Sequence, residues 1–161
     1  MITPDGTPTV VEFNCRFGDP ETQPILMRLK SDLVELCLAG IDGSLGDVEA
    51  QWDPRAAVGV VLAAGGYPES YAKGKPISGL DDCDTADSKT FHAGTELQGD
   101  QVVTSGGRVL CVTALGSNVT DAQQRAYQAV EKISWDGMFC RSDIAYLSLI
   151  HISEPTRQSL I

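Results

Sequence analysis

The stretch VVEFNCRFGDPETQP, residues 10–24, passes from an alternating pattern into a helix signal and decides how the first part of the chain folds. The alternation predicts a strand over 9–13, which returns from a turn over 4–6 where Pro and Gly stand together. Asp19 before Pro20 predicts a helix N-terminus, because aspartate is a good N-cap and proline is tolerated at the first helical position. We therefore expect a hairpin followed directly by a helix.

The rest of the chain alternates between helix signals and short apolar runs. A second helix is predicted after Asp32, and a connection over 41–52 leads into a β-rich part. A further helix is predicted to begin at Thr120, with its alanines on the buried side. Strands are predicted over 56–64, 89–93, 96–97, 101–104, 108–115 and 139–144. These patterns predict an α+β fold in two parts.

The domain boundaries follow from the change from helical to strand-like sequence patterns. We expect residues 1–50 to form a hairpin and two helices, and residues 51–146 to form a β-rich domain. Residues 147–161 fit no earlier pattern, and we expect them to be a non-native tail. Because Met1 opens directly in a strand that needs a neighbour, we also expect the chain to be a fragment.

Composition excludes several classes of protein. The chain has 161 residues, of which 42% are hydrophobic, so it can fill a core and is not generally disordered. The nine-residue apolar run over 56–64 is too short to cross a bilayer. The net charge of −10 argues against a broad nucleic-acid or membrane surface. Five cysteines without a C-x-x-C pair indicate free thiols in a reducing cytoplasm.

The predicted strand and the loop after it carry the candidate metal-binding and catalytic residues. Glu12 and Asn14 project from one strand face, about 6–7 Å apart along it, and both offer the hard oxygen ligands that Mg²⁺ takes. Arg16 is placed to meet a phosphate oxygen. Gly18 allows close backbone approach, and the helix beginning at Pro20 points free N–H groups at an anion. Metal, cation and helix end together are typical of phosphoryl transfer.

Spacing alone leaves a plainer interpretation open. Glu12 would then be an exposed strand residue paired with Arg16, and Asp19 only a helix cap. Other polar candidates have plain interpretations too. We expect His92 to be a hydrogen-bonded strand residue and Arg141 to form a local ion pair with Asp143.

The whole stretch EFNCRFGDPETQ, residues 12–23, closely resembles the phosphoribosylamine–glycine ligases, an ATP-grasp family of purine biosynthesis. RFGDPE is similar to that family's signature. The resemblance continues to residue 146 through LKSDLVELCLAG, VGVVLAAGGYP, FHAGT, SGGRVLCVTALG and FCRSDIAY. It implies that 1–50 is the C-terminal part of an ATP-grasp domain, with the last hairpin and helices of that domain. It also implies that 51–146 is the β-rich, barrel-like C-terminal domain of the ligase.

The resemblance also implies residue roles. Glu12 and Asn14 match the ligands that hold Mg²⁺, or Mn²⁺, on ATP. Arg16 matches a catalytic arginine near the transferring phosphate and the substrate. The loop that shapes the substrate side consists of Gly18, Asp19 and Pro20. In the family's reaction ATP phosphorylates the carboxylate of glycine, and 5-phosphoribosylamine then displaces phosphate to give glycinamide ribonucleotide.

The implied partners are ATP, glycine and 5-phosphoribosylamine, with no nucleic acid or membrane, in the cytoplasm. In this family the N-terminal domain, the adenine pocket and the glycine-rich lid lie upstream of the matched region, so we expect the chain alone to lack ligase activity. Two alternatives stay open. One is another ATP-grasp carboxylate–amine ligase or a carboxylase, and the other is a non-catalytic module that binds metal or phosphate.

Overall fold

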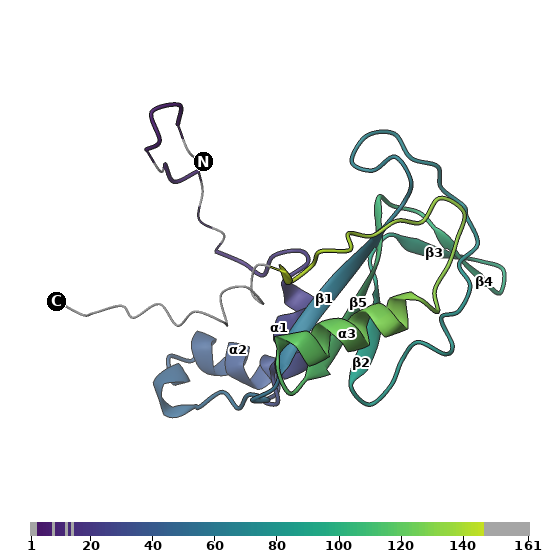
Figure 1. Cartoon of the computed structure of the whole chain (residues 1–161). Helices are drawn as coiled ribbons and strands as arrows, with labels where there is room; N and C mark the ends of the chain where they lie inside the picture. The colour runs from purple at the N-terminus through teal and green to yellow at the C-terminus, as the bar shows by residue number, and fades with distance from the viewer. Residues whose placement is uncertain (1–2, 8, 12, 14, 147–161) are drawn as a thin grey trace.

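A three-stranded antiparallel sheet forms the centre of the computed structural model (Figure 1), which describes residues 3–7, 9–11, 13 and 15–146. Strand β5 (Arg108–Gly116) runs between β1 (Ala56–Ala63) and β2 (Ser88–His92). From Val109 onward β5 is buried throughout, because it has a strand on each side and a helix over each face. The two long apolar runs form strands, β1 and β5, as predicted, and the structure pairs these strands with each other.

Helix α3 (Val119–Val130) covers one face of this sheet. Its alanines, including Ala122 and Ala126, are fully buried in the core cluster with Val60 and Leu62 of β1. Small side chains on the helix allow its backbone to approach the branched side chains of the strand closely. The predicted buried side of this helix is therefore confirmed.

Helix α3 begins one residue before the predicted start, and its cap lies two residues before Thr120, which the spacing of Thr120 and Gln123 predicts as the cap. The N-cap is Asn118, whose side chain accepts a hydrogen bond of 3.0 Å from the backbone N–H of Asp121. Thr120 therefore lies inside the first turn. Asparagine and threonine are both good caps, and the residue in extended conformation, here Asn118, takes the role.

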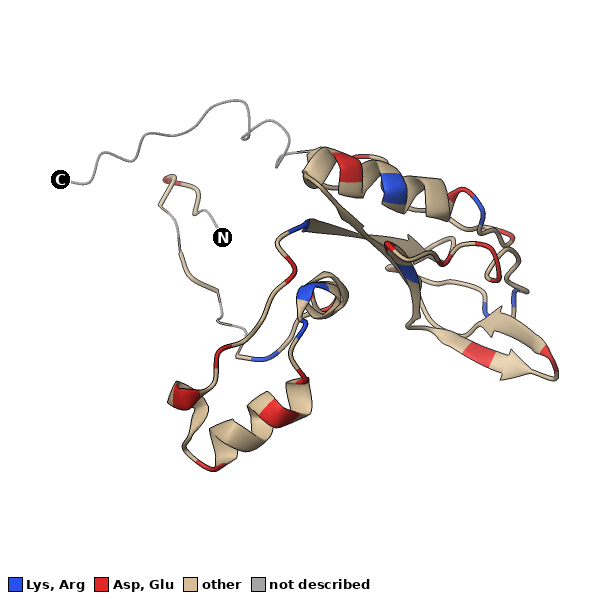
Figure 2. Cartoon of the chain, turned by 90° about the horizontal axis from the view of Figure 1, so that it is seen from below, with Lys and Arg blue, Asp and Glu red and all other residues tan. Residues whose placement is uncertain are grey.

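Helix α1 (Thr22–Arg28) contacts β1 and β5 on the opposite face, so that the sheet lies between α1 and α3 (Figures 1 and 2). Its Pro24 lies over Gly59 of β1. A Cβ at Gly59 would come within 3.0 Å of Pro24 Cγ and 3.3 Å of Cys111 Sγ. The missing side chain therefore provides the space in which α1 packs on the sheet.

Helix α2 (Leu33–Ile41) follows α1 as a separate helix, as predicted. Asp32 caps it by accepting hydrogen bonds from Val34 N and Glu35 N at 2.7 and 3.4 Å. None of its residues is buried, and it contacts the 3₁₀ turn η1 (Leu45–Asp47). Figure 1 shows α2 standing away from the central sheet.

The connection returns to the sheet through Trp52, which is 47% exposed and forms a β-bridge with Leu29 at the end of α1. The second tryptophan, Trp135, is 8% exposed and belongs to the main core. The two indole rings thus lie in different surroundings: Trp52 lies beside the helical segment, and Trp135 lies in the hydrophobic core.

Strands β3 (Thr95–Gln98) and β4 (Gln101–Thr104) form a separate hairpin, joined to the chain before β2 by a bridge between Pro76 and Val103. The α+β class with a β-rich second part is thus confirmed. The strands of the described residues form two open antiparallel sheets and do not close into a barrel.

The strand predicted over 9–13 is absent from the described part of that range, so this prediction was wrong there. The predicted turn is present, with Gly6 N donating to Thr3 O at 2.9 Å, but Val10 and Phe13 are exposed. A strand persists only when a neighbour satisfies its backbone groups. Among the described residues, no strand pairs with Val10, Val11 or Phe13.

The last predicted strand, over 139–144, is reduced to a single β-bridge between Phe139 and Ala63. The bridge exchanges two backbone hydrogen bonds, of 2.8 and 3.0 Å. Beyond Phe139 the chain leaves the sheet edge, and Arg141 pairs with Asp143 at 2.6 Å, as predicted. The expected tail, residues 147–161, lies outside the described residues.

No helix in the described part of the chain combines the length and the apolar character needed to pass through a lipid bilayer.

Candidate functional site

The loop over 16–21 folds back onto the first turn of α1. The carbonyl of Gly18 accepts hydrogen bonds from the backbone N–H and the hydroxyl of Thr22, at 3.1 and 2.5 Å. The helix begins at Thr22, and its N-cap Glu21 makes no side-chain cap bond. The prediction that Asp19 caps this helix was therefore wrong.

Asp19 instead forms an ion pair with Arg108, the first residue of β5. Arg108 Nη2 lies 3.1 Å from Asp19 Oδ2, and Arg108 Nη1 donates to the backbone carbonyl of Asp19 at 3.3 Å. The carboxylate is drawn toward this guanidinium from the sheet and away from the helix end. Sequence reasoning missed Arg108, because 89 residues separate it from its partner.

A polar cavity of about 410 Å³ lies between this loop and the start of β5. Two guanidinium groups and two carboxylates line it: Arg16, Arg108, Asp19 and Glu21. The side chain of Arg16 is exposed, and within the described residues it donates only to the carbonyl of Phe17, at 3.3 Å. Arg16 can therefore offer its remaining N–H groups to an anion, while Asp19 and Glu21 can accept from amines or hydroxyls.

The predicted metal ligands Glu12 and Asn14 lie outside the described residues. The described neighbours Val11, Phe13 and Cys15 are exposed. Within the described parts of the chain, no three His, Cys, Asp or Glu side chains gather where they could hold a metal ion. The assignment of Glu12 and Asn14 thus stays a prediction.

A second cavity, of about 200 Å³, is lined by Pro20 and is mainly apolar. Pro20, Gly59, Val61 and Phe139 contribute to its walls, and Arg108 lines it as well as the polar cavity. Burial raises the pKa of the Cys140 thiol, which also lines this cavity. A raised pKa keeps the thiol protonated and argues against a nucleophile there.

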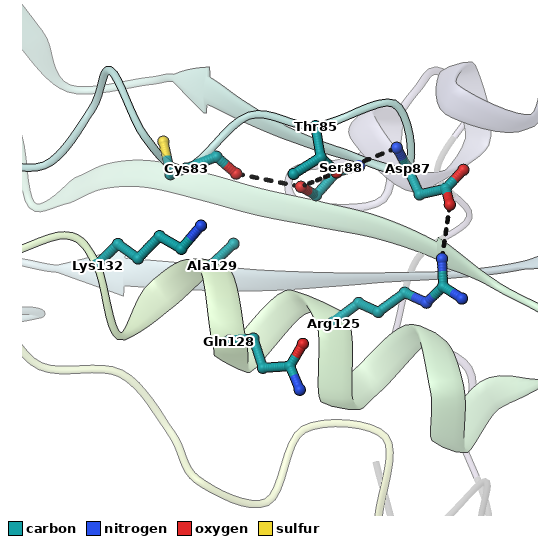
Figure 3. Close-up of a pocket in the computed structure, with 8 residues that line it drawn as sticks. All are labelled: Cys83, Thr85, Asp87, Ser88, Arg125, Gln128, Ala129 and Lys132. Carbon is teal, nitrogen blue, oxygen red and sulfur yellow. Dashed lines mark hydrogen bonds and ion pairs between the residues drawn. The ribbon is translucent and has the colours of Figure 1, made fainter.

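A third cavity, of about 340 Å³, lies between α3 and the loop before β2 (Figure 3). Its polar groups are largely paired with one another: Asp87 Oδ2 lies 2.6 Å from Arg125 Nη1, and the Thr85 and Ser88 hydroxyls lie 2.8 Å apart. Hydrogen bonding and charge from Arg55, and then the same from Arg125, hold the pKa of Asp87 below its usual range. We assign these groups a structural role.

His92, at the end of β2, is a hydrogen-bonded strand residue, as expected. Its Nδ1 lies 2.9 Å from the hydroxyl of Thr95. The imidazole thus joins the end of β2 to the start of β3. It does not line the polar cavity around Arg16.

The comparisons agree with one another. A profile described as "Phosphoribosylglycinamide synthetase, C domain" matches residues 57–147. The phosphoribosylamine–glycine ligase of Vibrio cholerae is 67% identical over 149 residues, covering 92% of this chain and 35% of the relative. The ligase of the same name from Escherichia coli is 60% identical over 150 residues, again with 92% and 35% coverage.

A solved structure is similar as well. The crystal structure of phosphoribosylamine–glycine ligase from Thermotoga maritima superimposes with a TM-score of 0.71 at 37% identity, covering 88% of this chain and 34% of that one. The chain therefore spans about a third of the length of the relatives it matches.

Proposed function

The chain belongs to the phosphoribosylglycinamide synthetase family, and we propose on this premise that it supplies the C domain and the RFGDPE loop of an ATP-dependent ligase. The ligase would join 5-phosphoribosylamine to glycine in purine biosynthesis, in the cytoplasm. The names of the relatives at 60–67% identity favour this reaction over that of another ATP-grasp ligase or a carboxylase. The same names speak against a module without catalysis.

The observation that carries this proposal is the polar cavity at the RFGDPE loop. In the proposed reaction the glycine carboxylate attacks the γ-phosphorus of ATP, ADP leaves, and glycyl phosphate forms. The amine of 5-phosphoribosylamine then attacks the acyl carbon and expels phosphate. Arg16 lines the cavity, and among the described residues it donates only to the carbonyl of Phe17. It would stabilise the negative charge shared by the phosphoryl oxygens and the carboxylate.

The roles of the remaining loop residues are proposed from the same resemblance. Glu12 and Asn14 would hold Mg²⁺ or Mn²⁺, which neutralises phosphate charge when bound, since their oxygens suit hard cations. Gly18, Asp19 and Pro20 would shape the substrate side. Gly18 and Asp19 line the polar cavity, and Pro20 lines the apolar one.

A hybrid enzyme tests the proposal. Residues 1–146 of this chain would replace the matching region of the Vibrio cholerae relative, which is similar enough for the exchange to fold. We expect ADP release that requires both glycine and phosphoribosylamine, together with Mg²⁺. A hybrid that melts cooperatively at the temperature of the relative but releases no substrate-dependent ADP would contradict the proposal.

The chain by itself is expected to be inactive, because it spans about a third of its relatives' length. Purified chain, incubated with ATP, Mg²⁺, glycine and phosphoribosylamine, should release no ADP above the rate without glycine. The active hybrid serves as the positive control. Glycine-dependent ADP release by the chain alone would show that this expectation is wrong.

A further inference from the structure

We propose that Arg108 is a positioning residue for the reaction: it neutralises Asp19 and thereby leaves Arg16 free for the anionic substrate. This inference rests on the proposed function, in which Arg16 meets the transferring phosphate. It assigns a task in the ATP-binding half of the chemistry to a strand of the C domain.

The position of Arg108 is fixed by the backbone around it. Arg108 pairs with Ala63 across the β1–β5 ladder, next to a register shift, and the preceding carbonyl, of Gly107, accepts a hydrogen bond of 2.9 Å from Ala64 N. A Cβ at Gly107 would lie 2.2 Å from the ring of Tyr67. The turn that brings Arg108 to the start of β5 therefore requires glycine.

Arg108 holds the loop through two contacts with Asp19. It meets both the carboxylate and the backbone carbonyl of Asp19, at 3.1 and 3.3 Å. The neighbouring Gly18 is held from the other side by Thr22 of α1. The loop is thus fixed between the helix and the sheet, two residues after Arg16.

The charges of the cavity explain why this pairing matters. Asp19 and Glu21 place two carboxylates in the cavity that also holds the Arg16 guanidinium. Opposite charges in one cavity attract at short range. Without Arg108, Asp19 would be the ready partner of Arg16, and an arginine paired with a carboxylate has fewer donors left for phosphate. Arg108 removes this competition.

The test uses four forms of the hybrid enzyme: unchanged, Arg108→Met, Asp19→Asn and the double variant. Arg108→Met should lower kcat by roughly ten- to a hundredfold, because Arg16 is misplaced, with a smaller effect on KM. The double variant should recover part of this loss, since the competing carboxylate is gone. Arg108→Lys, which keeps the charge, should stay nearer to the unchanged enzyme.

A matched control removes another partly exposed ion pair of the same domain. Lys75 Nζ lies 2.6 Å from Asp136 Oδ2, away from the loop, and Lys75→Met should leave kcat unchanged. If Arg108→Met and Asp19→Asn reduce kcat by independent factors, so that the double variant is worse than either, the proposal is overturned. Equal effects of Lys75→Met and Arg108→Met would likewise overturn it.

A spectroscopic measurement separates this proposal from the proposed function. In the full chain without the other domains, the Nε–Hε resonance of Arg16, assigned with Arg16→Lys, should shift in Arg108→Met and return in the double variant. A resonance that does not move contradicts the positioning role whatever the enzyme does. If the resonance moves as expected but the hybrid enzyme is inactive, the positioning role stands and only the proposed function is contradicted.

Discussion

At the scale of single residues, the charged groups of the RFGDPE loop show how the partner of one side chain determines its structural role. Asp19 carries the charge expected of a helix cap, but a stronger donor is within reach and takes it. Glu21 then stands at the N-cap position without a cap bond. A missing side-chain cap costs a helix about 1 kcal/mol, and the loop gains an anchor on the sheet.

Glu12 offers the most direct residue-scale test of the proposed metal site. In the hybrid enzyme Glu12→Gln should lower turnover by about a hundredfold or more, because the amide lacks the charge that a hard cation needs. The melting temperature should hardly change. Turnover and thermal unfolding, measured on the same preparation, check both statements.

Glu131→Gln is the matched control for Glu12, since it removes the same charge from an exposed position just after α3. It should leave both turnover and melting temperature unaltered. Near-normal turnover in Glu12→Gln would leave Glu12 without a ligand role. A large loss in Glu131→Gln would show that net charge, and not ligation, controls the rate.

Asp32 gives a second residue-scale prediction, about a cap that the sequence did identify. Asp32→Ala removes the acceptor of the hydrogen bonds from Val34 N and Glu35 N and should destabilise α2 by about 1 kcal/mol. Asp32→Asn keeps an acceptor and should lose less. Amide hydrogen exchange over α2 measures the difference, and equal exchange in both variants would contradict the assignment.

At the scale of elements, the packing of α1 on the sheet depends on a glycine in β1. Gly59→Val would place methyl groups where Pro24 and Cys111 already touch the Cβ position. Overpacking of this kind costs about 1–3 kcal/mol. Urea denaturation should therefore show a lower free energy of unfolding.

Gly40 in α2 serves as the opposite case. A Cβ there meets nothing within 4 Å, and alanine is favoured over glycine in a helix, so Gly40→Ala should stabilise α2 by up to about 1 kcal/mol. Stabilisation by Gly59→Val, or destabilisation by Gly40→Ala, would contradict the packing described here.

The elements that could be predicted are those whose signal is local. The apolar runs of β1 and β5 end at glycine turns, and Asp32 precedes a helical pattern, so their outlines follow from neighbouring residues. The strand predicted over 9–13 is absent from the described residues of that range. A strand needs a partner, and the sequence of the segment itself does not reveal whether one is present. Arg108 stayed hidden for the same reason: its role is set by a residue 89 positions away.

At the scale of the whole molecule, Asp87 joins segments that are far apart in the chain. It pairs with Arg55, just before β1, and with Arg125 of α3, each at 2.6 Å. Arg55 in turn pairs with Asp53 at 2.9 Å. Hydrogen bonds from Arg55 hold the pKa values of Asp53 and Asp87 below the usual range. This network fixes the connection from the helical segment onto the β-rich part.

These lowered pKa values determine the acid response. Since the folded state binds protons less readily than the unfolded chain, the network contributes its full stability above about pH 4 and loses it as the pH falls toward the folded pKa values. Asp87→Asn should lower the free energy of unfolding at pH 7. It should also weaken the decline between pH 4 and pH 2, as urea denaturation at several pH values can show.

Asp100→Asn is the control for this prediction. It removes one carboxylate from the β3–β4 turn, where the described residues show no ion pair to it. Its pH profile should follow that of the unchanged chain. An identical profile for Asp87→Asn would mean that the network carries no pH-dependent stability.

The different surroundings of Trp52 and Trp135 give the chain an optical reporter for each of its halves. Trp52, beside the end of α1, is open to aqueous quenchers, and Trp135 is shielded from them. Loosening of the helical segment alone should therefore change the intensity or wavelength of the Trp52 emission only, which is the fraction that aqueous quenchers reach. Unfolding of the β-rich part should expose Trp135 to the quencher as well. Emission measured with a quencher therefore distinguishes a local opening from global unfolding.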